Sequence, residues 1–386
     1  MAFDEFGSLI SQICSRSTLA AGRPLAWTII ANPSAGGFTI RSRWRRHRAQ
    51  LAASAGKSAR NALREGGPSL TAQKRGSVGA PGLVLTRAAG HAGEITNALI
   101  QEASAGGGSP AGLPFYLVIT AGGDGTSRDV MTSLYHAPAA IHDSFAVLRL
   151  PMGTGNDGSD TWELDRALDL LIGPSALARQ RVLRLRTASG RGPFLAFNIL
   201  SAGLDAFVTH MTNKTKGRMP GDSYKLWVDL AALFYDLIYK VGYMDVRATD
   251  SEGNEVHALR EKLLLLAVGE SGQRTYGSHK WILPDERNVC AIRQMSVFRK
   301  LALKGLFNYG THIYKPEVML WNAAVVSFSS EHPLLAQMDG ETVLLEKEDF
   351  PATIELTEPL IPILKGSGSG RPYPRLSVSA SSLSRQ

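Results

Sequence analysis

The sequence predicts an open α/β domain followed by a second domain that is rich in β-strands. Three apolar runs in the first half have the content of buried strands, and each ends in a glycine-bearing loop. Helical patterns separate these runs, and this alternation is typical of an open α/β sheet. Beyond residue 172 the apolar runs continue with few long helical patterns between them. A chain of 386 residues with 44% hydrophobic content is long enough for two domains.

The elements of the first domain follow from apolar content and periodicity. The pattern over 3–13 predicts a helix that packs against the body, with contact to a membrane as the weaker alternative. We expect buried strands at 25–31 and 114–120, a short strand at 82–86 and a further strand at 144–150. We expect helices at 91–102 and 127–135.

Other stretches of the first half are polar or low in apolar anchors. Residues 41–48 are strongly basic, which indicates a solvated helix face or a contact with phosphates and lipid headgroups. Residues 52–82 are rich in Ala, Gly, Ser, Lys and Arg, and we expect a mobile insertion there. The expected division of the chain is an extension at 1–24, the α/β domain at 25–172, the second domain at 173–365 and a disordered tail at 366–386.

The second half predicts mainly strands. We expect them at 193–200, 262–269, 291–298, 318–328 and 342–356. The exception is 222–240, where apolar residues crowd a helical pattern. This segment indicates a core helix, and a hydrophobic wall for an acyl chain is the functional alternative.

The three glycine-bearing loops carry the chemistry. They span Asn32–Gly37, Ala121–Thr126 and Pro151–Asp157. A strand, a glycine turn and a helix together aim backbone N–H groups and a positive helix terminus at an anion. Asp124 would repel a phosphate unless a cation lies between them or the carboxylate takes a proton. We expect Asp124 in an exposed loop. A plain D-G turn is the alternative, and the recurrence of similar loops argues against it.

Composition favours anionic partners and a reducing compartment. The formal net charge is +8 at pH 7, but the basic residues gather in 41–75 without interleaved aromatic platforms, so we expect no nucleic-acid partner. Cys14 and Cys290 provide no disulfide framework. Neither a signal peptide nor an apolar run of membrane-spanning length is recognisable. We expect a cytoplasmic protein that associates peripherally with membranes, and a homodimer stays an open alternative.

Six motifs in a fixed order resemble those of the diacylglycerol kinase catalytic-domain family. They are N-P-S-A-G-G at 32–37, T-R-A-A-G-H-A at 86–92, A-G-G-D-G-T at 121–126, P-M-G-T-G-N-D at 151–157, F-N-I-L-S-A-G-L-D-A at 197–206 and Q-M-D-G-E-T at 337–342. That family includes bacterial diacylglycerol kinases and the sphingosine and ceramide kinases. One glycine loop is a weak signal, whereas six ordered matches are not expected by chance.

The resemblance implies a two-domain lipid kinase that binds ATP between an α/β domain and a β-sandwich domain. In that family the last strands can return to the first domain. It also implies Mg²⁺ held by Asp124 and Asp157, directly or through water. The residues that it places around the nucleotide and its phosphates are Asn32, Ser34, Gly36, Thr86, Gly122, Gly123, Asp124, Gly125, Thr126, Gly153, Thr154, Gly155, Asn156 and Asp157.

The resemblance places Asp339 and Glu341 near the acceptor hydroxyl. Phosphoryl transfer needs positioning, charge neutralisation and a carboxylate that receives the hydroxyl proton. Bacterial members assign that role to the D-G-E acids and sphingosine-kinase-like members to the Asp of G-G-D-G, so Asp339, Glu341 and Asp124 are the catalytic candidates, and we favour Asp339. On an extended strand Asp339 and Glu341 would share a face, and their repulsion would raise the pKa of one of them. The D-G pair also predicts a hairpin turn.

Two departures from the family pattern mark this chain as divergent. Cys290 and Ala291 stand where bacterial members carry the Asp-Gly of a structural Mg²⁺ site, which puts that site in question. The run 181–186 lacks the Asp that many members carry there.

The sequence therefore predicts an ATP- and Mg²⁺-dependent kinase that converts diacylglycerol to phosphatidic acid at an anionic phospholipid membrane. The basic 41–48 segment is the expected docking contact. A sphingoid-base or ceramide kinase, a NAD kinase-like enzyme and an inactive membrane-binding regulator are the alternatives. The loop at 151–157 and the D-G-E element at 339–341 favour the lipid branch over the NAD kinases.

Overall fold

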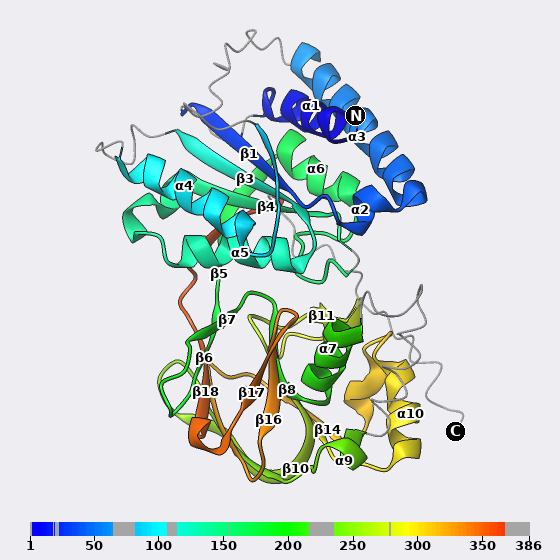
Figure 1. Cartoon of the computed structure of the whole chain (residues 1–386), viewed down its shortest axis with the longest axis vertical. Helices are drawn as coiled ribbons and strands as arrows, with labels where there is room; N and C mark the ends of the chain where they lie inside the picture. The colour runs from blue at the N-terminus through cyan, green and yellow to red at the C-terminus, as the bar shows by residue number, and fades with distance from the viewer. Residues whose placement is uncertain are drawn as a thin grey trace.

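A computed structural model describes residues 2–17, 19, 23–64, 82–105, 114–153, 155–215, 235–277 and 279–366. Two domains lie one above the other in Figure 1, the first built on a six-stranded sheet and the second on an 11-stranded sheet. This confirms the predicted combination of an α/β domain with a β domain. Parts of three predicted segments lie outside the described residues, namely 65–81, 222–234 and 367–386.

The first sheet is parallel except at one edge, and its strands follow the order β2-β1-β3-β4-β19-β5. The strands are β1 Leu25–Ala31, β2 Leu83–Leu85, β3 Phe115–Gly122, β4 Phe145–Pro151, β5 Ser175–Gln180 and β19 Ile361–Gly366. Strand β3 lies between β1 and β4, and all of its residues are buried. Because parallel strands end at the same edge, the loops after β1, β3 and β4 share one edge of the sheet.

Helices cover both faces of this sheet (Figure 1). One face carries α1 Ala2–Cys14, α2 Gly36–Thr39, α3 Arg41–Arg64 and α6 Leu164–Ile172. The other carries α4 His91–Ala105, α5 Asp124–Tyr135 and the 3₁₀ helix η2 Ala139–Ser144. Phe6, Ile10 and Ile13 of α1 are fully buried, which confirms that this helix packs against the body. Among the described residues, no helix has the length and apolar character needed to cross a membrane.

Helix α3 corrects the prediction of a mobile insertion at 52–82, because residues 52–64 are helical. Leu51 and Ala55 are buried, as are Ser54 and Ser58, and these positions recur at helical spacing. Alanine is the strongest helix former, and small side chains let a helix approach its neighbours closely. The Ala- and Ser-rich composition that suggested disorder therefore provides a narrow packing face.

The second sheet is antiparallel and curls around one core. Its strands follow the order β17-β16-β8-β10-β9-β15-β18-β6-β7, with β13 pairing β10 and β14 pairing β13. They are β6 Leu183–Arg186, β7 Phe194–Ala196, β8 Ile199–Gly203, β9 Tyr243–Thr249, β10 Glu255–Gly269, β13 Val289–Arg293, β14 Val318–Trp321, β15 Val325–Ser330, β16 Leu334–Met338, β17 Glu341–Leu345 and β18 Ala352–Leu356. Strand β10 joins the two halves, since its first part pairs with β9 and its second part with β8 and β13. Residues of both halves, among them Val246 and Ala336, form a single apolar cluster.

Shorter elements interrupt the predicted strands of the second domain. They are α7 Leu204–Thr215, α9 Tyr235–Ile238, α10 Val297–Leu306, the 3₁₀ helices η3 Thr311–Tyr314 and η4 Lys347–Asp349, and a separate hairpin of β11 Arg274–Tyr276 and β12 Lys280–Leu283. The strand expected at 291–298 ends at Arg293, and α10 begins at Val297 after Ser296 in extended conformation. A run of apolar residues does not by itself distinguish a short strand from a buried helix start.

The buried His312 of η3 predicts acid sensitivity of the fold. Its ring stacks on Phe307 and its Nε2 lies 3.2 Å from the Ile282 carbonyl oxygen. Burial lowers the pKa of His312 from 6.5 to about 4. Between these two pH values the unfolded chain binds a proton at this residue and the folded chain excludes it, so stability is lost as the pH falls.

We expect His312→Gln to reduce this loss. The wild-type contribution of His312 amounts to about 3 kcal/mol between pH 6.5 and pH 4, since one pKa unit corresponds to about 1.4 kcal/mol. Urea unfolding at a series of pH values measures it, and His47, whose pKa burial also lowers to about 4, contributes equally to both proteins. Identical pH dependence of wild type and variant would contradict this role of His312.

Candidate active site

The loops after β3 and β4 touch at the edge of the first sheet. A Cβ atom added to Gly153 would lie 2.5 Å from the Cα of Gly123, and one added to Gly122 would lie 2.4 Å from Thr126 Oγ1. Both positions require glycine because neighbouring atoms occupy the space of any side chain. The contact brings the start of α5 against the 155–158 segment.

Asn156 shapes the second of these loops. Its backbone has a left-handed φ of 59°, a conformation that Asn tolerates better than most residues. Its Oδ1 accepts the Gly153 N–H at 2.7 Å, and its Nδ2 donates to the Gly153 carbonyl oxygen at 3.1 Å. Thr154, which was predicted to contact nucleotide, lies outside the described residues.

Asp124 and Asp157 approach each other across these loops. A Cβ atom at Gly155 would lie 3.3 Å from Asp124 Oδ2 and 3.5 Å from Asp157 Oδ2, so both carboxylates face one point. Burial, followed by the charge of Asp157, raises the pKa of Asp124 to about 6. Asp124 is the first residue of α5 and its Oδ1 accepts the Gly158 N–H at 2.9 Å, so the expectation of an exposed loop position is wrong. The start of α5 packs against the neighbouring loop, and the Asp124 carboxylate is held by its hydrogen bond to that loop.

The second domain reaches the same carboxylates. Asp157 Oδ1 accepts the backbone N–H of His279 at 2.8 Å, from the turn between β11 and β12. The His279 ring packs on Trp162, with ring centroids 4.5 Å apart. The site therefore includes residues of both domains.

Asp339 lies in a tight turn between β16 and β17. Asp339 and Gly340 have φ values of 48° and 101°, as a type I′ hairpin turn requires, which confirms the predicted turn. The Asp339 carboxylate accepts the backbone N–H groups of Phe197, Asn198 and Ile199, the last two at 3.1 Å. Burial raises the pKa of Asp339, and these three hydrogen bonds oppose that increase.

Glu341 does not share a face with Asp339. The left-handed turn redirects the Asp339 side chain toward Phe197, whereas Glu341 is 60% exposed and its Oε1 lies 3.3 Å from Arg128 Nη2. The expectation of a repelling pair on an extended strand is therefore wrong, because Asp339 is not extended. Arg128 belongs to α5, so the ion pair links the two domains.

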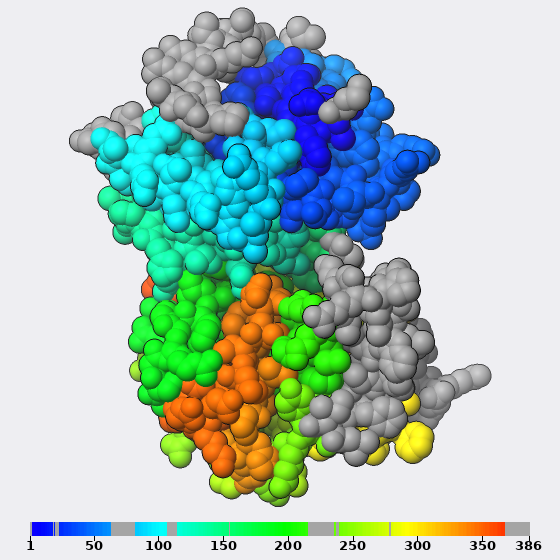
Figure 2. Space-filling view, viewed as in Figure 1, coloured from blue at the N-terminus to red at the C-terminus, as the bar shows by residue number. Residues whose placement is uncertain are grey.

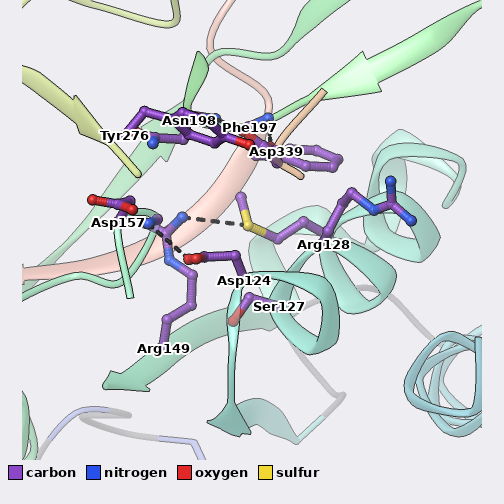
Figure 3. A pocket seen from close by; sticks show the side chains of 11 residues that line it. Asp124, Ser127, Arg128, Arg149, Asp157, Phe197, Asn198, Tyr276 and Asp339 are labelled. Carbon is purple, nitrogen blue, oxygen red and sulfur yellow. Dashed lines mark hydrogen bonds between the residues drawn. The ribbon is translucent and has the colours of Figure 1, made fainter. Parts of the chain in front are cut away.

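A small cavity separates the carboxylates of the two domains (Figure 3). Asp124, Asp157 and Arg149 line it from the first domain, and Tyr276 and Asp339 line it from the second. Arg149 also forms a buried ion pair with Asp160, with 2.6 Å between Nη2 and Oδ1. The arrangement puts acidic side chains on both walls of one enclosed space.

Two larger cavities lie beside α5. One of about 530 Å³ is lined by five of the predicted nucleotide residues, namely Asn32, Ser34, Thr86, Gly125 and Thr126. The other, of about 610 Å³, lies between α4, α5 and the strands β7 and β17. Both are bounded by Arg128 and Glu341. Gly36 is buried at the start of α2, where the next residue, Gly37, donates its N–H to the Met152 carbonyl oxygen at 2.8 Å.

Sequence reasoning missed two residues beside this site. Tyr276 of β11 lines the small cavity and its hydroxyl lies 2.9 Å from Thr209 Oγ1 of α7. Asp205 at the start of α7 accepts a hydrogen bond from Ser201 Oγ at 2.7 Å, and burial raises its pKa to about 6. Asp205 falls in the motif at 197–206, which could have identified it, whereas no local pattern around Tyr276 indicates a site.

The structural metal site of the bacterial pattern has no counterpart in the described residues. Cys290 and Ala291 are buried in β13, and the nearby Asp285 forms an ion pair with Arg287. Across the described parts of the chain, His, Cys, Asp and Glu form no group of three or more that could hold a metal ion.

The fold combines an α/β domain with a second β domain, and the two carboxylates meet on glycine loops of the first. Residues 26–188 match the model of the diacylglycerol kinase catalytic domain, which confirms the resemblance seen in the sequence motifs. No curated protein matches the sequence.

Solved structures share the fold over nearly the whole chain. A provisionally named diacylglycerol kinase from Bacillus anthracis strain Sterne is 16% identical, with a TM-score of 0.53 over 88% of this chain and 96% of that chain. A diacylglycerol kinase from the same strain is 14% identical, with a TM-score of 0.50 over 89% of this chain and 97% of that one. At such identities the likeness shows the arrangement of both domains and no more.

We expect Asp339→Asn to destabilise the second domain. Three backbone N–H groups would lose a charged acceptor, which costs about 1–3 kcal/mol. Glu341→Gln is the matched control, because this exposed side chain forms only an ion pair at the surface and should leave the melting temperature unchanged. Thermal unfolding followed by circular dichroism measures both. Equal melting of Asp339→Asn and wild type would show that the turn does not depend on this anchor.

Proposed function

We propose that this protein is an ATP-dependent lipid kinase that transfers the γ-phosphate to the hydroxyl of diacylglycerol and forms phosphatidic acid. The observation that carries the proposal is the meeting of Asp124 and Asp157 over touching glycine loops that face the second domain. Glycine loops of this kind bind phosphates through backbone N–H groups. The family match at 26–188 supports the lipid hydroxyl as acceptor.

The nucleotide is proposed to bind in the cavity of about 530 Å³ after β1 and β3. Its walls offer side-chain oxygens of Asn32, Ser34, Thr86 and Thr126, which can bind a ribose and phosphates. Arg128 lies where this cavity meets the small acidic one, and its guanidinium can contact phosphate once it leaves Glu341. The nucleotide cavity, Arg128 and the small acidic cavity thus lie side by side between the proposed nucleotide and the proposed acceptor.

Asp124 and Asp157 fit a magnesium ion that is shared with the nucleotide. Mg²⁺ commonly takes one or two carboxylates and completes its shell with phosphate oxygens and water. The elevated pKa of Asp124 reflects, after burial, the repulsion by Asp157 that a cation would relieve. When bound there, Mg²⁺ would neutralise charge on the transferred phosphoryl group.

Asp339 is the proposed acceptor of the hydroxyl proton. It faces the small cavity from the second domain, and its carboxylate is fixed by three backbone N–H groups. Burial raises the pKa of Asp339, which moves a carboxylate toward the range of an efficient general base. Asp124 is the alternative base, but its carboxylate is directed toward Asp157. Glu341 is proposed to hold Arg128 at the entrance of the nucleotide cavity.

Radiolabelled ATP with mixed lipid vesicles tests the substrate. We expect the label in phosphatidic acid when diacylglycerol, a sphingoid base, ceramide and NAD are offered in parallel. Label in a sphingoid-base phosphate or ceramide phosphate would replace the proposed acceptor and keep the lipid kinase. Label in NADP, or ATP binding without transfer to any acceptor, would overturn the proposed function.

Two substitutions separate the proposed roles of the carboxylates. Asp124→Asn should remove Mg²⁺-dependent activity and weaken binding of Mg²⁺-ATP, with the fold retained. Asp339→Asn should lower kcat by roughly two to four orders of magnitude, the usual contribution of a general base, with ATP affinity unchanged. Steady-state kinetics with lipid and a separate Kd for ATP distinguish the two effects.

The same measurements identify a wrong division of roles. If Asp339→Asn and Glu341→Gln both keep full kcat, Asp124 becomes the base. If both abolish ATP binding, these acids are structural. Full activity of Asp124→Asn at an unchanged melting temperature would refute the central assignment.

A further inference from the structure

Helix α10 presents apolar side chains to solvent. Phe298 is 83% exposed and Leu301 is 48% exposed, although both are large hydrophobic residues. Ala302 and Gly305 are also exposed, so positions i, i+3, i+4 and i+7 form one apolar stripe on the outer face of the helix. The outer face of a helix in water ordinarily carries polar residues, and a continuous apolar stripe there indicates a binding surface.

Two exposed tyrosines follow the helix in the chain. Tyr309 is 66% exposed and Tyr314 of η3 is 69% exposed. Tyrosine has an apolar ring and a polar hydroxyl, and it is enriched at the boundary between lipid and water. We use the name α10 surface for Phe298, Leu301, Tyr309 and Tyr314 together with the basic residues described next.

Exposed basic residues flank the apolar groups. Arg299, Lys304 and Lys315 are exposed, and between residues 297 and 317 Glu317 is the sole acidic residue. Glu317 forms an ion pair with Arg299. The α10 surface is therefore apolar at its centre and positively charged around it, which complements an anionic lipid surface.

The inner face of α10 holds the surface in place. Leu303 is buried in an apolar cluster with Ile282, Ile292 and other residues of the second domain. The buried Lys300 forms an ion pair with Asp236 at 2.6 Å, between Nζ and Oδ2. Figure 1 shows α10 at the outer edge of the second domain, away from the six-stranded sheet. The exposed side chains thus project from a packed helix.

We propose that the α10 surface docks this protein on anionic phospholipid bilayers. Phe298 and Leu301 would insert among the acyl chains, the tyrosines would lie at headgroup level and the basic residues would contact lipid phosphates. A second copy of the chain is a poorer partner, because two such surfaces would bring like charges together. The basic stretch of α3 provides charge without exposed large apolar groups beside it, apart from Ile40.

The inference deepens the proposed function and rests on it for its purpose, since a lipid kinase must reach its substrate at a membrane. The docking itself is measured without phosphoryl transfer. Sedimentation of the full-length chain with vesicles of phosphatidylcholine, alone or mixed with phosphatidylserine, gives the fraction bound. The double variant Phe298→Ser/Leu301→Ser removes the inserting groups, and Leu177→Ser on β5, which is 50% exposed, is the matched control.

We expect wild type to bind vesicles that contain phosphatidylserine and the double variant to bind them about tenfold more weakly. Leu177→Ser should bind as wild type does, and all three proteins should melt together because the changed residues are exposed. Part of the wild-type binding should persist in high salt, since insertion of apolar groups is not screened. Unchanged binding by the double variant would overturn the proposal.

Further outcomes also test the proposed docking of the α10 surface. Loss of binding only in Arg45→Gln/Arg46→Gln would place docking on α3 and overturn the proposal. A dimer of wild type that the double variant loses in analytical ultracentrifugation would make the surface an interface between copies. Activity on a detergent-dispersed diacylglycerol, retained by the double variant, would separate docking from catalysis and support the proposal. Docking that depends on α10 in a protein without kinase activity would refute the proposed function alone.

Discussion

The contact between Gly123 and Gly153 is the constraint on which the candidate site depends. The loops that follow β3 and β4 approach so closely that a Cβ atom at Gly153 would lie 2.5 Å from the Cα of Gly123. This contact brings Asp124 and Asp157 toward one point, where their mutual repulsion contributes to the raised pKa of Asp124. Two carboxylates in such proximity destabilise the fold, and that cost is characteristic of functional sites.

The second domain completes this arrangement through backbone groups. The His279 N–H binds Asp157 from one side, and the turn at Asp339 holds the 197–199 segment on the other. The chain passes between the domains twice, from β5 to β6 and from β18 to β19, and β5 and β19 pair side by side in the first sheet. Paired crossings restrict how far the domains can separate. The partly exposed Arg128–Glu341 ion pair is a further link between the domains.

Local patterns in the sequence predicted the first sheet and its loops because each buried strand carries its own apolar run. The D-G turn was equally predictable, since Asp339 and Gly340 both need left-handed φ angles. Contacts between residues that are distant in sequence were not predictable from such local patterns. The anchoring of the Asp339 carboxylate by Phe197–Ile199 joins residues about 140 positions apart, and the helical packing of 52–64 depends on neighbours that composition does not reveal. Tyr276 gains significance only from the position of its strand against Asp157.

Charge is distributed unevenly over the molecule, and this distribution bears on how its ligands are bound. Asp124, Asp205 and Asp339 accept hydrogen bonds from backbone N–H groups or a hydroxyl. The two arginines that line the small cavity, Arg128 and Arg149, form ion pairs with Glu341 and Asp160. The net charge of +8 comes instead from residues such as those of α3 and the α10 surface. A phosphate beside Asp124 and Asp157 would be repelled unless a divalent cation lies between them. An anionic bilayer, by contrast, meets the basic exterior. Under the two proposals, the basic exterior would bind the membrane and the paired carboxylates would select a metal-bound phosphate.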